Sequence, residues 1–247
     1  TIILNGDILT DIDITKMASF HKKSDAAVTI ALHRVEDPSA YGLVETDSNN
    51  KVLRFLEKPN ADESRGNSWI SAGIYIFNKK VLDYIPAGKN YSVERQFYPQ
   101  VLKIGENVRA YKADFYWLDI GRLDKYVQAN FDVLEKKFTD PVIKYAKILK
   151  WDVFFGKGVK TDKKVFLRGP AYIGDNSIIK KCSINPLSII GNNCVIGDNS
   201  SVEKSIIWED TVIEENAVIK NSVIGRGCVI HSNAHIEDAV IGDKTII

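Results

Sequence analysis

The most regular pattern of hydrophobic positions lies in the last third of the chain, from Thr161 to Ile247. Branched side chains recur every 17 residues in three columns, and a small residue (Ala, Ser, Thr or Cys) stands two positions before each column position. The columns are 173, 190, 207, 224 and 241; 179, 196, 213, 230 and 247; and Asn185, Val202, Ile219 and Ile236. The resulting spacing of six, six and five residues predicts a parallel β-helix, with the branched side chains inside and the small ones near the corners.

The first 140 residues instead alternate short apolar runs with amphipathic stretches. Thr1 to Leu4 predicts a strand, and Asp13 is a candidate N-cap for a helix over 14–22. A second strand is expected over 26–33, and strand, helix, strand in this order is typical of a βαβ unit in a parallel sheet. The apolar runs 41–46 and 51–56 flank a polar loop and predict a hairpin.

Further strands are expected over 69–77 and 108–113, and helices over 79–85, 92–103 and 123–137. Asp140-Pro141 ends the last helix, because proline cannot continue one. The chain is therefore expected to divide into an α/β domain over 1–140, a linker over 141–160 and the β-helix over 161–247.

Composition narrows the class of protein. The 247 residues are 45% hydrophobic and 26% charged, with a net charge of +1. This charge gives no electrostatic case for nucleic acid or for an anionic membrane surface, and no apolar run reaches the roughly 20 residues of a membrane span. Three cysteines without metal or redox spacing fit a reducing cytoplasm.

The first candidate for chemistry is Asp7, at the end of Asn5-Gly6-Asp7. A carboxylate just past the C-terminal end of a buried strand is where α/β sheets place ligand chemistry. The same tripeptide is also typical of a turn, so both readings stay open at this point.

Five motifs follow one another along the chain: Leu-Asn-Gly-Asp (4–7), Tyr-Gly-Leu-Val-Glu (41–45), Glu-Lys-Pro (57–59), Ser-Ala-Gly-Ile-Tyr-Ile-Phe (71–77) and Trp-Leu-Asp-Ile-Gly (117–121). In this order they resemble the sugar-1-phosphate nucleotidylyltransferases, and most closely the branch of mannose-1-phosphate guanylyltransferase and glucose-1-phosphate nucleotidylyltransferase. The resemblance implies the fold class: α/β, with a partial doubly wound, Rossmann-like nucleotidyltransferase domain followed by a left-handed parallel β-helix.

The resemblance also implies roles for single residues. Asp7 and Asp119 match the two carboxylates that hold a catalytic Mg²⁺, and Mg²⁺ favours such oxygen ligands. Lys58 matches the lysine that contacts the sugar 1-phosphate, and Glu57 matches the acceptor for sugar hydroxyls.

Three more positions are implied at the sugar. Gly42 and Gly73 match positions where the backbone approaches the sugar closely. Ser71 stands where many relatives have Asn, which puts that sugar contact in question.

The implied reaction transfers a nucleoside monophosphate from a nucleoside triphosphate to mannose or glucose 1-phosphate and releases pyrophosphate. A homo-oligomer is expected. The family's glycine-rich phosphate loop is absent, and the chain opens on Thr1 inside a strand, so we expect a piece of a longer protein that is inactive alone.

Alternatives remain for the site and for the function. Glu57 and Lys58 could be a solvated ion pair, and Asp119 could cap the helix that follows it. A hexapeptide-repeat acyltransferase would use a coil histidine, for which His231 and His235 are the candidates. A non-catalytic, regulatory relative of the same fold is the third alternative.

Overall fold

The computed structural model describes residues 1–58, 60, 66, 68–137, 147–148 and 152–247. The chain forms two compact units, Thr1–Lys125 and Tyr126–Ile247, and the limit between them falls within helix α4 (Leu123–Leu134). Residues 141–146 and 149–151 of the expected linker lie outside the described residues. The three-part division expected from the sequence stays a prediction, because compact units and domains need not share their limits.

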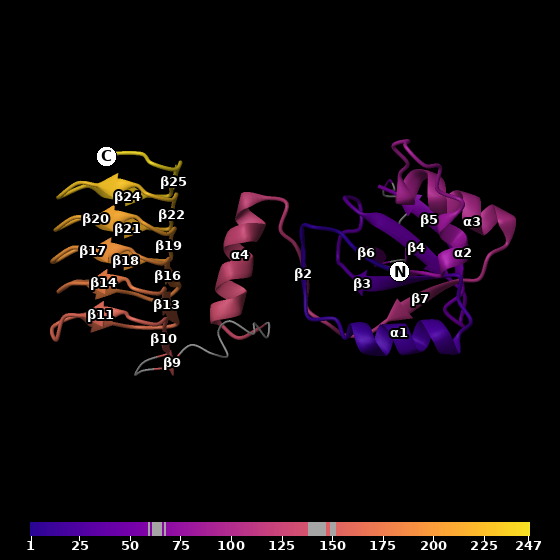
Figure 1. Ribbon diagram of the computed structural model, residues 1–247, viewed down its shortest axis with the longest axis horizontal. Coiled ribbons are helices and arrows are strands. Elements are labelled where there is room, and N and C mark those ends of the chain that lie inside the picture. The colour runs from indigo at the N-terminus through magenta and orange to yellow at the C-terminus, as the bar shows by residue number, and fades with distance from the viewer. Residues whose placement is uncertain (59, 61–65, 67, 138–146, 149–151) are drawn as a thin grey trace. The chain divides into compact units, whose positions relative to one another are not determined.

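The N-terminal unit is built on a six-stranded sheet of order β5-β4-β6-β3-β7, in which β1 also pairs with β6 (Figure 1). Its strands are β1 (Ile2–Leu4), β3 (Val28–Arg34), β4 (Gly42–Thr46), β5 (Val52–Glu57), β6 (Trp69–Phe77) and β7 (Val108–Lys112). A separate antiparallel pair joins β2 (Ile8–Thr10) to β8 (Trp117–Asp119).

The sheet is mixed rather than parallel. The strands on either side of helix α1 (Ile14–Lys23), β1 and β3, both pair antiparallel with β6, and among the described residues of this sheet only β3 and β7 form a parallel pair. Strand β6 therefore lies between the two strands that the βαβ pattern suggested as parallel neighbours. They run in the same direction without sharing hydrogen bonds.

Helical segments cover both faces of this sheet, as in a doubly wound fold. Met17 of α1 packs with Ala31 and Ile74 on one face. The other face packs against α2 (Lys79–Leu82), the π-helical turn η1 (Val93–Phe97) and α3 (Tyr98–Ile104). Helix α1 begins at the expected cap, because the Asp13 carboxylate accepts a hydrogen bond of 2.9 Å from the backbone N–H of Lys16.

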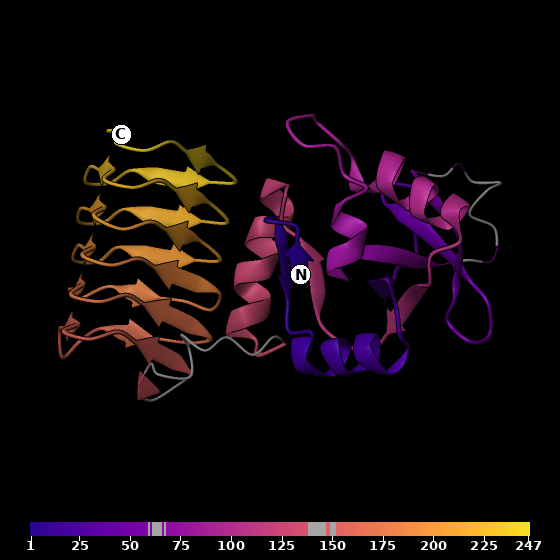
Figure 2. The same cartoon turned by 45° about the vertical axis from the view of Figure 1, so that its right-hand side comes forward.

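The C-terminal unit is a stack of three-sided coils (Figure 2). Three parallel ladders run along the stack, apart from the antiparallel contact between β9 and β10. The first ladder holds β9 (Lys147–Ile148), β10 (Val153–Phe155), β13 (Ala171–Ile173), β16 (Ser188–Ile190), β19 (Ile206–Ile207), β22 (Val223–Ile224) and β25 (Val240–Ile241). The second holds β11 (Lys160–Thr161), β14 (Ile178–Ile179), β17 (Val195–Ile196), β20 (Val212–Ile213) and β23 (Val229–Ile230). The third holds β12 (Phe166–Leu167), β15 (Ser183–Ile184), β18 (Ser201–Glu203), β21 (Val218–Lys220) and β24 (His235–Glu237).

The 17-residue code describes the interior of this stack well. Ile190, Ile196 and Ile207 are fully buried, and small residues such as Ser188 and Cys194 are buried beside them. All three cysteines are free and buried, and burial raises the pKa of the Cys194 thiol to about 11. The first coil strand, β10, lies inside the range that the sequence analysis assigned to the linker.

One column position predicted from the sequence is wrong. Ile184, not Asn185, aligns with Val202 and fills the interior, and Cys182 rather than Ser183 takes the small position. This coil is one residue shorter before Ile184 and one residue longer after it. The extra residue sits in the corner that contains Pro186 and Leu187, where Leu187 adopts a left-handed backbone with φ +59°. The Asn185 side chain instead donates a hydrogen bond to the Ser201 hydroxyl.

Candidate functional site

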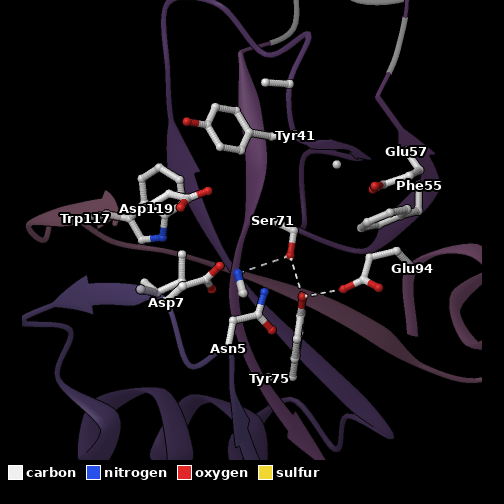
Figure 3. Close-up of a pocket in the computed structure, with 14 residues that line it drawn as sticks. Asn5, Asp7, Tyr41, Phe55, Glu57, Ser71, Tyr75, Glu94, Trp117 and Asp119 are labelled. Atoms are coloured by element: carbon white, nitrogen blue, oxygen red, sulfur yellow. Dashed lines mark hydrogen bonds between the residues drawn. The ribbon is translucent and has the colours of Figure 1, made fainter. Parts of the chain in front are cut away.

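A cavity of about 150 Å³ opens in the N-terminal unit, where several strand ends meet. Figure 3 shows its acidic side chains in two groups, with Asp7 and Asp119 on one side and Glu57 and Glu94 on the other. The volume is below the roughly 300–1,000 Å³ of pockets for drug-sized ligands, so it fits a ligand of about one ring.

The β4–β5 hairpin places two of the predicted residues in the cavity. Its antiparallel register sets Gly42 directly opposite Glu57. A Cβ added at Gly42 would lie 2.5 Å from the Phe55 ring and 3.1 Å from Oε2 of Glu57. Glycine is therefore required here for space, and the carboxylate of Glu57 lies directly over the backbone of Gly42.

The β2–β8 ladder brings Asp7 and Asp119 together, although they are far apart in sequence. Ile8 pairs with Asp119, and the backbone N–H of Ile120 donates to the carbonyl of Asp7 at 2.8 Å. A Cβ added at Gly121 would lie 3.1 Å from Oδ1 of Asp119 and 3.5 Å from Oδ2 of Asp7. Both carboxylates thus border one small space that glycine leaves open.

Strand β6 supplies the floor of the cavity through Ser71 and Gly73. Gly73 has φ +71°, and a Cβ there would lie 2.7 Å from Nδ2 of Asn5. The backbone N–H of Asn5 in turn donates to the carbonyl of Gly73 at 2.8 Å. The left-handed backbone and the close approach both require glycine at this position.

The structure does not place Lys58 among the residues that line the cavity. Its side chain is exposed, and its backbone adopts φ +50°, which is uncommon for a residue with a Cβ. The backbone N–H of Lys58 donates to the carbonyl of Tyr41 at 3.1 Å, which closes the end of the hairpin. Pro59, the third residue of the Glu-Lys-Pro motif, lies outside the described residues.

Two aromatic residues that the sequence analysis left without a role form one wall. The indole N–H of Trp117 donates to the carbonyl of Ala72 at 2.9 Å, and Tyr41 meets the indole edge-on with ring centroids 5.4 Å apart. Behind them His33 stacks on Trp117 at 5.3 Å, and burial lowers the pKa of its imidazole. Trp117 and Tyr41 both lie within the motifs quoted above, so those motifs could have identified them as site residues.

Glu94 and Tyr75 also line the cavity and were missed as site residues. The Tyr75 hydroxyl donates to Oε1 of Glu94 at 3.1 Å, and burial is the main cause that raises the pKa of Tyr75 well above its usual range. Glu94 lies in the π-helical turn η1, and such turns are frequent at functional sites. Nothing in the local sequence pattern indicates that this turn reaches the strand ends.

No group of three or more His, Cys, Asp or Glu side chains that could hold a metal occurs in the part of the chain that the structure describes. No helix within that part is long and apolar enough to cross a membrane. The two coil histidines are exposed on the C-terminal unit: His231 lies 3.2 Å from Glu214, and His235 lies 3.6 Å from Glu237.

Strand-end carboxylates, a sheet covered on both faces and a stack of coils are the features that the motif resemblance implied, and the family models agree with it. Residues 1–136 match the family model "Nucleotidyl transferase", and residues 150–247 match "EIF2B subunit epsilon LbH domain", which describes a left-handed β-helix. The first match covers more than half of the chain. The protein therefore belongs to the nucleotidyl transferase family, as the motifs predicted.

Curated relatives agree with this assignment. The chain is 36% identical to a UTP--glucose-1-phosphate uridylyltransferase of Synechocystis sp., over 70% of this chain and 45% of that protein. It is 36% identical to a mannose-1-phosphate guanylyltransferase of Mycobacterium tuberculosis, over 58% of this chain and 39% of that protein. It is 32% identical to a glucose-1-phosphate adenylyltransferase of Clostridium novyi, over 74% and 48%. The chain thus spans less than half the length of these relatives.

Proposed function

We propose that this chain is part of an enzyme that transfers a nucleoside monophosphate from a nucleoside triphosphate to a hexose 1-phosphate. Mannose and glucose 1-phosphate are the expected acceptors, and the activity would be similar to that of a mannose-1-phosphate guanylyltransferase. The observation that carries this proposal is a cavity with room for about one sugar ring, with Asp7 and Asp119 at one end and Glu57 next to Gly42 at the other.

In the proposed reaction an oxygen of the sugar phosphate attacks the α-phosphorus of the triphosphate. The new P–O bond forms as the bond from the α-phosphorus to its bridging oxygen breaks, and pyrophosphate leaves with that oxygen. No covalent intermediate on the protein is required. The protein's contribution is to hold the acceptor in line and to complement the charge that develops.

Asp7 and Asp119 would hold a divalent cation, which we propose to be Mg²⁺. The space bordered by Gly121 fits this role, because two carboxylates face it and no side chain fills it. Mg²⁺ is commonly bound by one or two carboxylates together with waters and substrate phosphates, so a third protein ligand is not needed. When bound, the ion would supply positive charge at the phosphate oxygens.

The sugar would lie between Glu57 and the backbone at Gly42 and Gly73. The Glu57 carboxylate can accept hydrogen bonds from sugar hydroxyls, while the two glycines let Phe55 and Asn5 pack close to the main chain beside the space that the ring would enter. We keep Lys58 as the proposed contact to the sugar phosphate. It follows Glu57 directly, and its four-carbon stem is exposed and can turn toward a bound anion.

The second candidate function is a non-catalytic role in a protein of the same fold. The observation that favours it is the match of residues 150–247 to a domain model named for EIF2B subunit epsilon rather than for a transferase. We also keep a cytoplasmic location as a proposal, supported by three free cysteines. The expected homo-oligomer stays a prediction.

The test is formation of nucleoside diphosphate sugar by the protein that carries this sequence, with Mg²⁺, each of GTP, UTP, ATP and dTTP, and mannose or glucose 1-phosphate. Asp7→Asn and Asp119→Asn should each lower turnover by about 100-fold or more, because each removes a charged oxygen at the phosphates. Asp83→Asn, at an exposed carboxylate outside the cavity, should leave turnover unchanged.

If the wild type is active and one of these variants keeps that activity, the substituted carboxylate has no part in the mechanism. Binding of sugar phosphate without any product formation, with all four triphosphates, would favour the non-catalytic candidate instead.

A further inference from the structure

The link between strands β1 and β2 contains Asn5-Gly6, the one Asn-Gly pair in the sequence. In such a pair the backbone nitrogen of the glycine can attack the side-chain carbonyl carbon of the asparagine and release ammonia. Glycine favours this attack because it has no Cβ to hinder the approach. In a folded protein the attack also requires that neither the backbone of the glycine nor the amide of the asparagine is held by other contacts.

The backbone of Gly6 meets this requirement. A Cβ added at Gly6 would find nothing within 4 Å, in contrast to the Cβ at Gly42 or Gly73. The residues on either side are held, because the N–H of Asn5 donates to Gly73 and the carbonyl of Asp7 accepts from Ile120, each at 2.8 Å. The Gly6 backbone between them has no hydrogen bond to any of the described residues. The Gly6 nitrogen is therefore free to turn toward Asn5.

The side chain of Asn5 meets it as well. Asn5 is exposed and lines the cavity, where Figure 3 shows its amide. Within the part of the chain that the structure describes, this amide forms no hydrogen bond and only packs beside Gly73. Water reaches the side-chain carbonyl carbon, and no hydrogen bond has to break before the ring closes.

An asparagine in the coils shows the opposite situation. Asn199 is also exposed and is followed by a small residue, Ser200. Its side-chain amide donates to Oδ1 of Asn216 at 3.4 Å, and its backbone N–H donates to the carbonyl of Lys181 at 2.7 Å. Ser200 is buried, with 1% of its surface exposed. The coil thus holds both reacting groups in place, so Asn199 serves as an internal control for Asn5.

We propose that Asn5 is a site of spontaneous deamidation. The Gly6 nitrogen attacks Cγ of Asn5, the new N–Cγ bond forms, and the bond from Cγ to Nδ2 breaks. Ammonia leaves with the proton that the Gly6 nitrogen loses. Water then adds to one of the two carbonyl carbons of the resulting succinimide ring and opens it. The product is aspartate or isoaspartate at position 5, and water is the only co-reactant.

Both products add a negative charge to the cavity, because a carboxyl group with the ordinary aspartate pKa of about 3.9 is ionised at neutral pH. Four acidic side chains already line the cavity: Asp7, Glu57, Glu94 and Asp119. A fifth carboxylate disfavours any ligand with a phosphate group, since like charges repel. Isoaspartate also lengthens the main chain between β1 and Asp7 by one CH₂ group. The inference does not rest on the proposed function, because the reaction involves only this chain and water.

The experiment incubates the folded protein that carries this sequence at mildly alkaline pH and follows its peptides by mass spectrometry. The peptide that contains Asn5 should gain the mass difference between a hydroxyl and an amino group. It should also accept a methyl group from a methyltransferase specific for isoaspartate. The peptide that contains Asn199 should stay unmodified over the same period.

The matched variant is Gly6→Ala. It should fold as the wild type does, because the added Cβ meets no other residue and the backbone of Gly6 is not left-handed. The methyl group hinders ring closure, so deamidation of Asn5 should be slower by about 10-fold or more. Asn5→Asp supplies the aspartate product as a reference when the forms are separated by ion exchange.

Two results would overturn the inference. One is an unmodified Asn5 peptide in the folded protein after an incubation that deamidates the same peptide in the urea-unfolded protein. The other is an equal rate of deamidation in the wild type and in Gly6→Ala. Neither result bears on the proposed function, which is tested by product formation in freshly prepared protein.

Discussion

In the coils, the place of a residue in the 17-residue period decides whether it is buried. Ile178 and Ile179 are neighbours in strand β14, yet 40% of Ile178 is exposed and only 1% of Ile179. In the N-terminal unit no such period exists, and the cavity gathers residues as distant as Asn5 and Asp119. Local sequence therefore specifies the coils, whereas pairing between distant strands specifies the site.

The backbone hydrogen bonds reflect the same difference. In the stack, backbone groups bond to the adjacent coils, as when Ile178 donates to Cys194 at 2.8 Å and Val195 donates to Thr211 at 3.0 Å. Each repeat therefore needs only its neighbours. In the N-terminal unit, the carbonyl of Asp7 accepts from Ile120 at 2.8 Å, and most of the unit's sheet lies between these two residues in the sequence.

The largest expected effect tests the inside and outside of one coil strand. Ile179→Asp would bury an unpaired charge among apolar side chains and should lower the free energy of unfolding by about 4 kcal/mol or more. Ile178→Asp places the same side chain on the surface, opposite Lys160, and should cost no more than about 1 kcal/mol. Denaturant unfolding of both variants measures the difference, and similar losses would contradict the assignment of faces.

The one error in the coils shows where a period stops being sufficient. A 17-residue repeat fixes the total number of residues in the three faces and three corners of a coil. One corner can nevertheless be a residue shorter and the next a residue longer without changing that total. Asn185 and Pro186 enlarge one corner in this way, and Ile184 takes the column position. The alternation of buried and exposed side chains predicts which residues lie on the faces. It does not predict the length of a corner, which depends on which residues can adopt the backbone conformation of the turn.

Of the seven site residues that the motifs predicted, the structure brings six to one cavity: Asp7, Gly42, Glu57, Ser71, Gly73 and Asp119. Their roles stay proposals. Lys58 could not be placed from its neighbour Glu57, because successive strand residues point to opposite faces and its backbone turns left-handed. Glu94 could not be found at all, since its approach to Tyr75 depends on how η1 packs on the sheet.

An intermediate effect is expected from glycine substitutions in the N-terminal unit. Here a glycine lets another residue pack close to the backbone, and no sequence period marks its position. Gly73 and Gly88 both have φ +71°, but only a Cβ at Gly73 meets another residue, at 2.7 Å from Asn5. Gly88→Ala should cost about 1 kcal/mol from backbone strain alone. Gly73→Ala should cost about 2–4 kcal/mol and also weaken sugar phosphate binding, because Asn5 must move.

Thermal unfolding of the two glycine variants, with sugar 1-phosphate binding as the second measurement, separates strain from contact. Equal losses of stability and unchanged binding in both variants would show that the approach of Asn5 to Gly73 does not shape the cavity.

The smallest expected effect concerns Tyr98, behind the floor of the cavity. The residue is fully buried and stacks on Phe55 with ring centroids 4.9 Å apart, and its hydroxyl has no hydrogen-bond partner among the described residues. Burial raises the pKa of this hydroxyl well above its usual range, so it stays protonated at ordinary pH and carries an unused donor.

Because an unpaired buried hydroxyl is costly, Tyr98→Phe should leave stability unchanged or raise it by up to about 1 kcal/mol. Tyr75→Phe is the contrasting variant, since it removes a hydroxyl that bonds both Ser71 and Glu94, and it should lose about 1–2 kcal/mol. Urea unfolding measures both changes in stability from the shift of the urea concentration at the midpoint, provided that the dependence of the unfolding free energy on urea stays the same. A loss in Tyr98→Phe as large as that in Tyr75→Phe would mean that both hydroxyls belong to one hydrogen-bond network beneath the cavity, which would then extend further into the core than Tyr75.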